Sequence, residues 1–145
     1  MRSKKIPQPA GLTLIELLIV VALVGILGTI AVSSYGEYVR RSDRSEARTI
    51  MLEAGNWMER RFTVHHSYLN GGGAIPTLPL DMRQSPKTGT AKYVIGLIAK
   101  DTSPTTYKLQ AVPQRSDRCG TFMLDQSGAR SLRDNTASVE ECWQR

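Results

Sequence analysis

The sequence predicts an α+β protein in which one long N-terminal helix, from about residue 12 to 63, packs on a small antiparallel sheet of about four strands. Three observations support this fold class: an unbroken apolar segment near the N-terminus, a helical spacing of apolar residues up to Phe62, and alternating β-branched and aromatic residues after Lys92. The 145 residues suit one domain with one appendage.

The apolar segment Leu12–Val32 is long enough to cross a membrane. As a helix it would extend about 32 Å, which matches the hydrocarbon core of a bilayer. The basic residues that precede it are Arg2, Lys4 and Lys5. This charge distribution predicts an N-terminus on the cytoplasmic side.

A carboxylate inside this segment, Glu16, needs a reason. An acid in such a position costs a few kcal/mol on insertion scales. Two ordinary alternatives are a secretory signal peptide cleaved near Ala31-Val32-Ser33, and a plain signal anchor. Neither of them explains Glu16, which indicates a functional role for this side chain.

The run Gly11-Leu12-Thr13-Leu14-Ile15-Glu16-Leu17 resembles the class III signal peptide of type IV prepilins, whose usual form is G-F-T-L-I-E. The resemblance implies that residues 1–11 are a leader, which a dedicated peptidase removes between Gly11 and Leu12. The same enzyme would methylate the new N-terminus at Leu12. Residues 12–33 would then be the transmembrane and filament-core helix, and residues 34–145 a globular pilin domain outside the cytoplasm.

The resemblance also gives Glu16 a partner. In the low dielectric of packed apolar helices an unpaired carboxylate is costly, and a cation relieves that cost. The resemblance implies that the cation is the Leu12 amine of a neighbouring subunit, with Thr13 completing the assembly motif. Pairing of Glu16 with the amine of its own chain, four residues away, is the alternative.

Nothing between Val32 and Phe62 stops a helix, because this stretch contains no proline. Apolar residues recur there at three- and four-residue spacing, at Ala47, Ile50, Met51, Ala54, Trp57, Met58 and Phe62. This stripe is expected to face the sheet. The opposite face carries Arg40, Arg44 and Arg48, which predicts a solvated face or a subunit contact in preference to a DNA contact.

Residues 68–91 are rich in glycine and proline and are expected to form a loop. The four predicted strands are Lys92–Ala99, Thr105–Val112, Gly120–Asp125 and Ala129–Leu132. Their hairpin connections predict an antiparallel sheet with one face on the helix stripe.

The chain has two cysteines, Cys119 and Cys142. In an exported chain these most simply form one disulfide, which would stabilise a small core by roughly 3.5 kcal/mol. The segments Asp117–Thr121, Leu124–Gly128 and Cys142-Trp143 resemble the end of the PilE-like minor pilins, in which two cysteines close the D-region over the sheet edge.

A structural subunit of a type IV pilus, and a minor one, is therefore the leading hypothesis. Such a subunit would support pilus biogenesis, twitching motility, adhesion or DNA uptake. Its partners would be other pilins, the prepilin peptidase and the inner-membrane assembly machinery. It would sit in the inner membrane of a Gram-negative bacterium before entering an extracellular pilus.

Two alternatives stay open. A type II secretion pseudopilin would share the first half of the chain, although major pseudopilins usually lack this disulfide. A DNA-binding pilin would need a basic patch, for which the candidates are Arg115, Arg118, Arg130 and Arg133. The net charge of +6 supports nucleic acid only weakly.

Neither an enzyme nor a cofactor is expected. The sequence offers no nucleophile–base set, and the glycines at 71–73 are not followed by the Lys-Ser/Thr of a nucleotide loop. His65 and His66 are adjacent and have no clustered acid or cysteine nearby, so no metal site is predicted.

Overall fold

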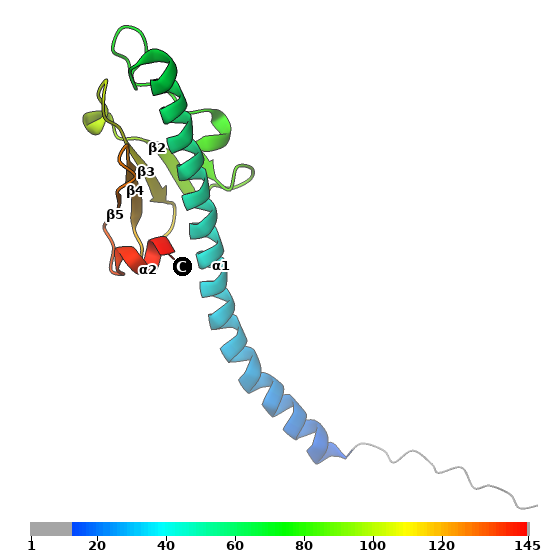
Figure 1. The fold of residues 1–145 in the computed structure, drawn as a ribbon. Coiled ribbons are helices and arrows are strands. Elements are labelled where there is room, and N and C mark those ends of the chain that lie inside the picture. The colour runs from blue at the N-terminus through cyan, green and yellow to red at the C-terminus, as the bar shows by residue number, and fades with distance from the viewer. Residues whose placement is uncertain (1–12, 145) are drawn as a thin grey trace, which may run out of the picture. The chain divides into compact units, whose positions relative to one another are not determined.

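The computed structural model describes residues 13–144, with the backbone alone for residues 30–34. The chain forms two compact units, Met1–Tyr38 and Val39–Arg145. Helix α1 (Leu14–His65) contributes to both of them (Figure 1). The expected long helix is confirmed, and it ends where His66 takes a positive φ of 53°, a left-handed conformation that commonly terminates helices.

In the second unit, five antiparallel strands form one sheet in the order β1-β2-β3-β4-β5. Their bounds are β1 Gln84–Ser85, β2 Tyr93–Leu97, β3 Lys108–Pro113, β4 Thr121–Asp125 and β5 Arg130–Arg133. Figure 1 shows the sheet beside the C-terminal half of α1. Each strand pairs in the sheet with the strand next to it in the sequence, as expected for successive hairpins.

The core lies between α1 and one face of the sheet. The α1 stripe of Ala47, Ile50, Met51, Ala54 and Met58 is fully buried. The register places Ile95, Ala111, Phe122 and Leu132 in one row across four strands. Side chains on the same face of paired strands pack together, so this row forms a continuous apolar surface.

Gly55 sets how closely the helix and sheet approach. A Cβ at this position would lie 3.4 Å from the Tyr107 hydroxyl and 3.5 Å from Leu124 Cδ2. A larger side chain would therefore push against the sheet.

The structure differs from expectation in its short elements. The sheet has five strands and not four, because β1 lies inside the predicted loop and pairs with β2. A C-terminal helix α2 (Val139–Gln144) and two 3-10 turns, Leu80–Met82 and Ala99–Asp101, were also not expected. A strand of two residues and helices of fewer than two turns are too short for hydrophobic periodicity to reveal them.

Candidate functional site

The first site is the start of α1, where Thr13 and Glu16 bind one another. The Glu16 N–H donates to Thr13 Oγ1 at 3.3 Å, and the Thr13 N–H donates to Glu16 Oε2 at 3.4 Å. The Thr13 hydroxyl donates to the same carboxylate oxygen at 3.3 Å. This reciprocal pattern is a capping box, in which two otherwise unpaired N–H groups gain acceptors. Glu16 therefore also stabilises the helix start, a role that sequence reasoning missed although Thr-x-x-Glu indicates it.

The side chains that follow are exposed on all sides of the helix. The large apolar residues from Leu14 to Leu27 are between 54% and 78% exposed. So large an apolar surface calls for a lipid or protein partner.

Among the residues that the structure describes, no helix is both long enough and apolar enough to cross a membrane.

The expected cleavage and methylation positions, Gly11 and Leu12, lie outside the described residues.

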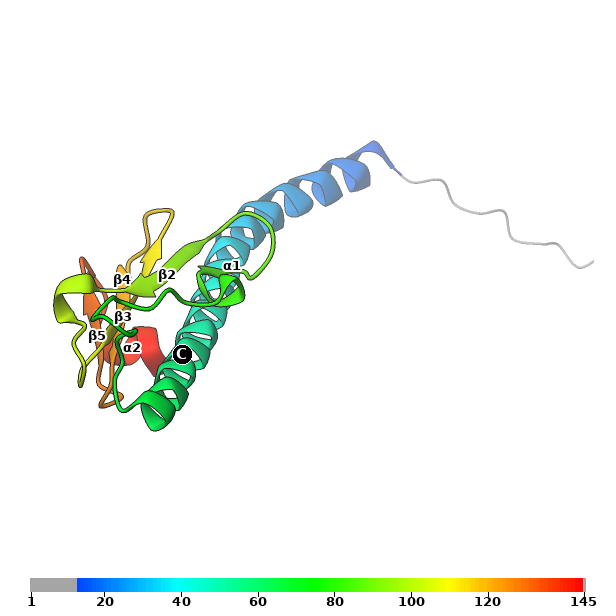
Figure 2. The same ribbon diagram turned by 90° about the horizontal axis from the view of Figure 1, so that it is seen from above.

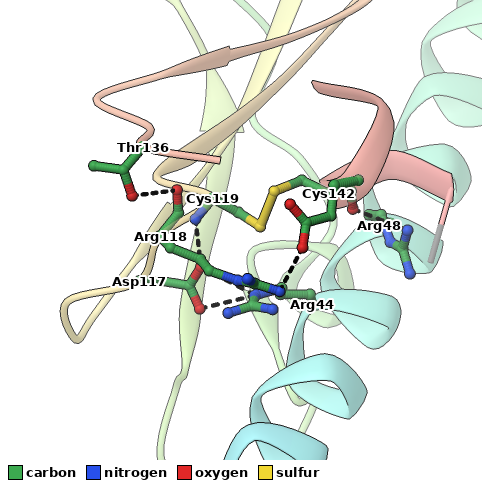
Figure 3. A network of polar contacts seen from close by, with 8 residues as sticks. Arg44, Arg48, Asp117, Arg118, Cys119, Thr136 and Cys142 are labelled. Carbon is green, nitrogen blue, oxygen red and sulfur yellow. Dashed lines mark hydrogen bonds and ion pairs between the residues drawn. A yellow bond between two sulfur atoms is a disulfide. The ribbon is translucent and has the colours of Figure 1, made fainter. Parts of the chain in front are cut away.

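The second site surrounds the disulfide, shown in Figure 3. Cys119 and Cys142 are bonded, with their Cα atoms 5.7 Å apart, and both are buried. The bond ties the β3–β4 connection to α2, so the predicted disulfide is confirmed. Figure 2 shows α2 between the sheet and α1.

A buried ion pair joins α1 to the same connection. Arg44 Nε lies 3.0 Å from both carboxylate oxygens of Asp117. These side chains are 3% and 8% exposed. Asp117 Oδ1 also accepts the Cys119 N–H at 2.8 Å. The expectation that Arg44 lies on a solvated face is therefore wrong, because Asp117 pairs with it inside the protein.

Two further arginines lie against the end of α2. Arg48 Nη1 donates to the Cys142 carbonyl at 3.0 Å. The Arg130 guanidinium lies 5.3 Å from the centre of the Trp143 ring, a cation–π geometry. Burial lowers the pKa of Arg48, and the positive charges of Arg130 and Arg44 lower it further. This α2 arginine cluster, defined as Arg44, Arg48 and Arg130, lies beside α2, and Asp117 offsets the charge of its buried member Arg44.

Trp143 anchors α2. Its ring packs edge-on against Phe122 with centroids 5.3 Å apart, and its indole N–H donates to the Ser131 carbonyl at 3.2 Å. The pair Cys142-Trp143 marked this region in the sequence. The sequence also singled out Arg44, Arg48 and Arg130, but it did not indicate that they meet around α2.

The predicted arginine patch is divided between several environments. Arg118 pairs with Glu141 at 2.7 Å, beside α2. Arg133 lies 3.5 Å from Asp134 and donates to Gln110 at 3.2 Å. Residues three apart on β5 face opposite sides of the sheet, so Arg130 and Arg133 do not share a face.

Arg115 is exposed and makes no hydrogen bond or ion pair within residues 13–144. His65 closes α1, and His66 follows it. Within the same residues, no group of three or more His, Cys, Asp or Glu side chains is placed to hold a metal.

Comparison with known proteins agrees with this geometry. Residues 8–32 match the "Prokaryotic N-terminal methylation motif", which defines the class of prepilin-like proteins. Residues 33–123 match the family described as "Type IV minor pilin ComP, DNA uptake sequence receptor". The chain belongs to this family of type IV minor pilins.

Individual relatives match only part of the chain. Fimbrial protein EcpC of Eikenella corrodens is 60% identical over 37 residues, which is 26% of this chain and 24% of that protein. Type IV major pilin protein PilE1 of Neisseria gonorrhoeae is 45% identical over 62 residues, 43% of this chain and 34% of that protein. The chain thus spans about a quarter to a third of the length of these curated relatives.

The solved structure of the non-core minor pilin PilV from Neisseria meningitidis has the same fold, with a TM-score of 0.50 and 20% sequence identity. The match covers 70% of this chain and 94% of that one.

Proposed function

We propose that this protein is a minor subunit of a type IV pilus, processed from a membrane-held precursor and assembled through its apolar N-terminal helix. The observation that carries the proposal is the exposed apolar surface of Leu14–Leu27, which is unfavourable in water and suits first a bilayer and then neighbouring helices. The match of residues 8–32 to a methylation motif supports the same sequence of events.

Residues 1–11 would be the leader, cleaved between Gly11 and Leu12 by the prepilin peptidase, which also methylates Leu12. Residues 12–33 would hold the precursor in the inner membrane, with the N-terminus in the cytoplasm. Export of residues 34–145 agrees with a disulfide, which persists in oxidising compartments. Relatives from Neisseria support a Gram-negative host and an extracellular pilus.

In this proposal Glu16 acts in assembly. When the subunit moves from the bilayer into a bundle of packed helices, an unpaired Glu16 carboxylate would be costly. The Leu12 amine of an adjacent subunit supplies the cation that pairs with it. The inner-membrane assembly machinery would extract the subunit once this pair can form. The relatives are pilins and fimbrial proteins, which favours a pilus over a type II secretion pseudopilus.

The test is intact mass and N-terminal sequencing of the protein from sheared surface filaments. N-methylated Leu12 in an oxidised chain would support processing, filament entry and export together. A mature chain that never leaves the envelope would favour the pseudopilin, and a chain starting near Ser34 would make this an ordinary secreted domain.

DNA binding is a second candidate function. The family description names a DNA uptake sequence receptor, and the exposed Arg115 and Arg130 supply positive charge at the surface of this chain. Contacts to phosphates release counterions, so the affinity should fall steeply with salt. The test is binding of duplex DNA to the full chain in detergent across a salt series, for wild type and for Arg130→Gln. An affinity independent of salt would count against this candidate.

A further inference from the structure

The segment after α1 contains an exposed asparagine followed by three glycines. The Asn70 N–H donates to the Ala74 carbonyl at 2.7 Å, and the Gly73 N–H donates to the Asn70 carbonyl at 3.0 Å. These bonds hold the main chain of Asn70 in a turn, while its side chain and Gly71 stay exposed to solvent. This turn is in the green loop at the C-terminal end of α1 in Figure 1.

Asparagine followed by glycine is chemically labile. The backbone nitrogen of the following residue can attack the side-chain amide carbon, and glycine has no Cβ to hinder the approach. The other asparagines of the chain are Asn56, which precedes Trp57 inside α1, and Asn135, which precedes Thr136. Asn70 is therefore the most reactive position of its kind by local sequence.

The attacking nitrogen must first lose its proton, and a hydrogen bond would oppose that loss. Within residues 13–144 the Gly71 N–H donates no hydrogen bond. Gly71 also lacks a positive φ, and a Cβ placed there would contact nothing within 4 Å. The nucleophile is thus free, and the position tolerates alanine.

Arg61 contacts the atom on which negative charge develops. Its Nη2 donates to Asn70 Oδ1 at 2.7 Å, and its guanidinium is held 5.1 Å from the centre of the Trp57 ring. When the nitrogen attacks, Oδ1 becomes an oxyanion, and a positioned cationic donor stabilises such a charge.

Water has access to the same atoms. A surface cavity of about 400 Å³ is lined by Arg61, His65, Ser67, Leu69, Asn70 and Gly71. No carboxylate is among these lining residues, so the cavity is positively charged at Arg61.

We propose that Asn70 is a site of spontaneous deamidation promoted by Arg61. The Gly71 nitrogen forms a bond to Asn70 Cγ, the Cγ–Nδ2 bond breaks, and ammonia leaves with the proton from Gly71. Water from the cavity then opens the resulting succinimide at either carbonyl, which yields aspartate or isoaspartate. The net reaction consumes one water and releases one ammonia, with no oxidant or reductant.

The product changes both charge and backbone at the end of α1. A carboxylate at position 70 pairs with Arg61 and removes the net positive charge of the cavity. Isoaspartate adds a methylene to the main chain and breaks the turn that joins Asn70 to Gly73 and Ala74. An old subunit would therefore present a different surface from a newly exported one.

The test is incubation of the purified full chain in detergent at mildly alkaline pH, followed by peptide mass mapping and isoelectric focusing. We expect an acidic isoform to accumulate, with Asp and isoAsp at position 70 and with Asn56 and Asn135 intact. An Asn70 that stays intact while the urea-unfolded chain converts would overturn the proposal.

Two variants separate the contribution of the Gly71 nitrogen from that of the Arg61 guanidinium. Gly71→Ala, which the backbone accommodates, should slow conversion severalfold in both the folded and the unfolded chain. Arg61→Gln should slow it severalfold in the folded chain alone, because only the fold brings Arg61 to Oδ1. Equal rates for Arg61→Gln and wild type in the folded chain would overturn the role of Arg61.

Discussion

At the residue scale, Glu16 has one observed role and one proposed role, which substitution can separate. It caps the start of α1 through Thr13, and in the proposed filament its charge pairs with an amine. A cap contributes about 1 kcal/mol, whereas an unpaired buried charge costs several kcal/mol. The charge is therefore expected to dominate in assembly.

We expect Glu16→Ala to be processed and inserted in the membrane but absent from filaments. Glu16→Gln is the sharper variant, because glutamine can keep the capping box while removing the charge. Immunoblotting of the sheared and envelope fractions measures how much of each variant enters filaments and how much stays in the membrane. Wild-type amounts of Glu16→Gln in the sheared fraction would show that capping, and not charge pairing, is what assembly requires.

Gly120 is a second position where a single substitution has a large expected effect, because there is no room for a Cβ atom. Its φ is +58°, and a Cβ there would clash with the Arg133 carbonyl oxygen and lie 2.7 Å from Asp134 O. Gly128→Ala is a matched control, since its φ is +78° but nothing lies within 4 Å. We expect Gly128→Ala to lower the free energy of unfolding by about 1 kcal/mol through backbone strain alone.

Gly120→Ala should lower the free energy of unfolding by at least about 3 kcal/mol, because the backbone strain and the clash with the Arg133–Asp134 backbone add together. Urea unfolding of the full chain in detergent, followed by tryptophan fluorescence, provides the comparison. Equal losses for both variants would mean that the Arg133–Asp134 backbone moves aside.

At the element scale, a disulfide ties α2 to the β3–β4 connection, and a buried ion pair holds that connection to α1. We expect Arg44→Ala to cost about 3–5 kcal/mol of unfolding free energy, because it leaves the Asp117 carboxylate buried without its cation. The double variant Arg44→Met with Asp117→Asn should recover much of this loss, since asparagine keeps an acceptor for the Cys119 N–H. A double-mutant cycle of Arg44→Met, Asp117→Asn and the double variant, followed by urea unfolding, measures the coupling.

A coupling close to zero would show that Arg44 contributes through packing of its aliphatic chain alone. The disulfide should be intact in every variant, which a thiol assay checks.

At the scale of the whole molecule, the core between helix and sheet holds three buried tyrosines with raised pKa values. Burial, followed by the hydrogen bond to Glu59, raises the pKa of Tyr68 to about 12. Burial is also the main cause of the raised pKa values of Tyr93 and Tyr107. All three hydroxyls therefore keep their protons in the folded protein at pH values where the unfolded chain loses them.

The unfolding free energy should consequently be constant up to about pH 10 and fall above it, because the unfolded state then binds fewer protons. The Tyr68 contribution is lost as the pH rises toward 12. Urea unfolding at a series of alkaline pH values tests this, with Tyr68→Phe as a control that should fall less steeply. A slope unchanged by Tyr68→Phe would assign the alkaline loss to Tyr93 and Tyr107.

The cysteine pair followed from the count, because the chain has only two cysteines. Local patterns in the sequence determined the long helix, its apolar first half and the positions of the four longer strands. These features depend on periodicity and spacing within a few residues, so they are visible without a fold. The Thr13–Glu16 contact is of the same kind, since a capping box spans only one helical turn.

Only the tertiary structure decided which charges are buried and which face water. Arg44 meets Asp117 from 73 positions away, and Arg48 reaches Cys142 from 94, so no local pattern could predict that they leave the solvated face. The strand register likewise separated Arg130 from Arg133. The physical reason is that burial and pairing of a charge depend on partners that the folded chain brings together, whereas helix and strand formation depend on neighbours along the chain.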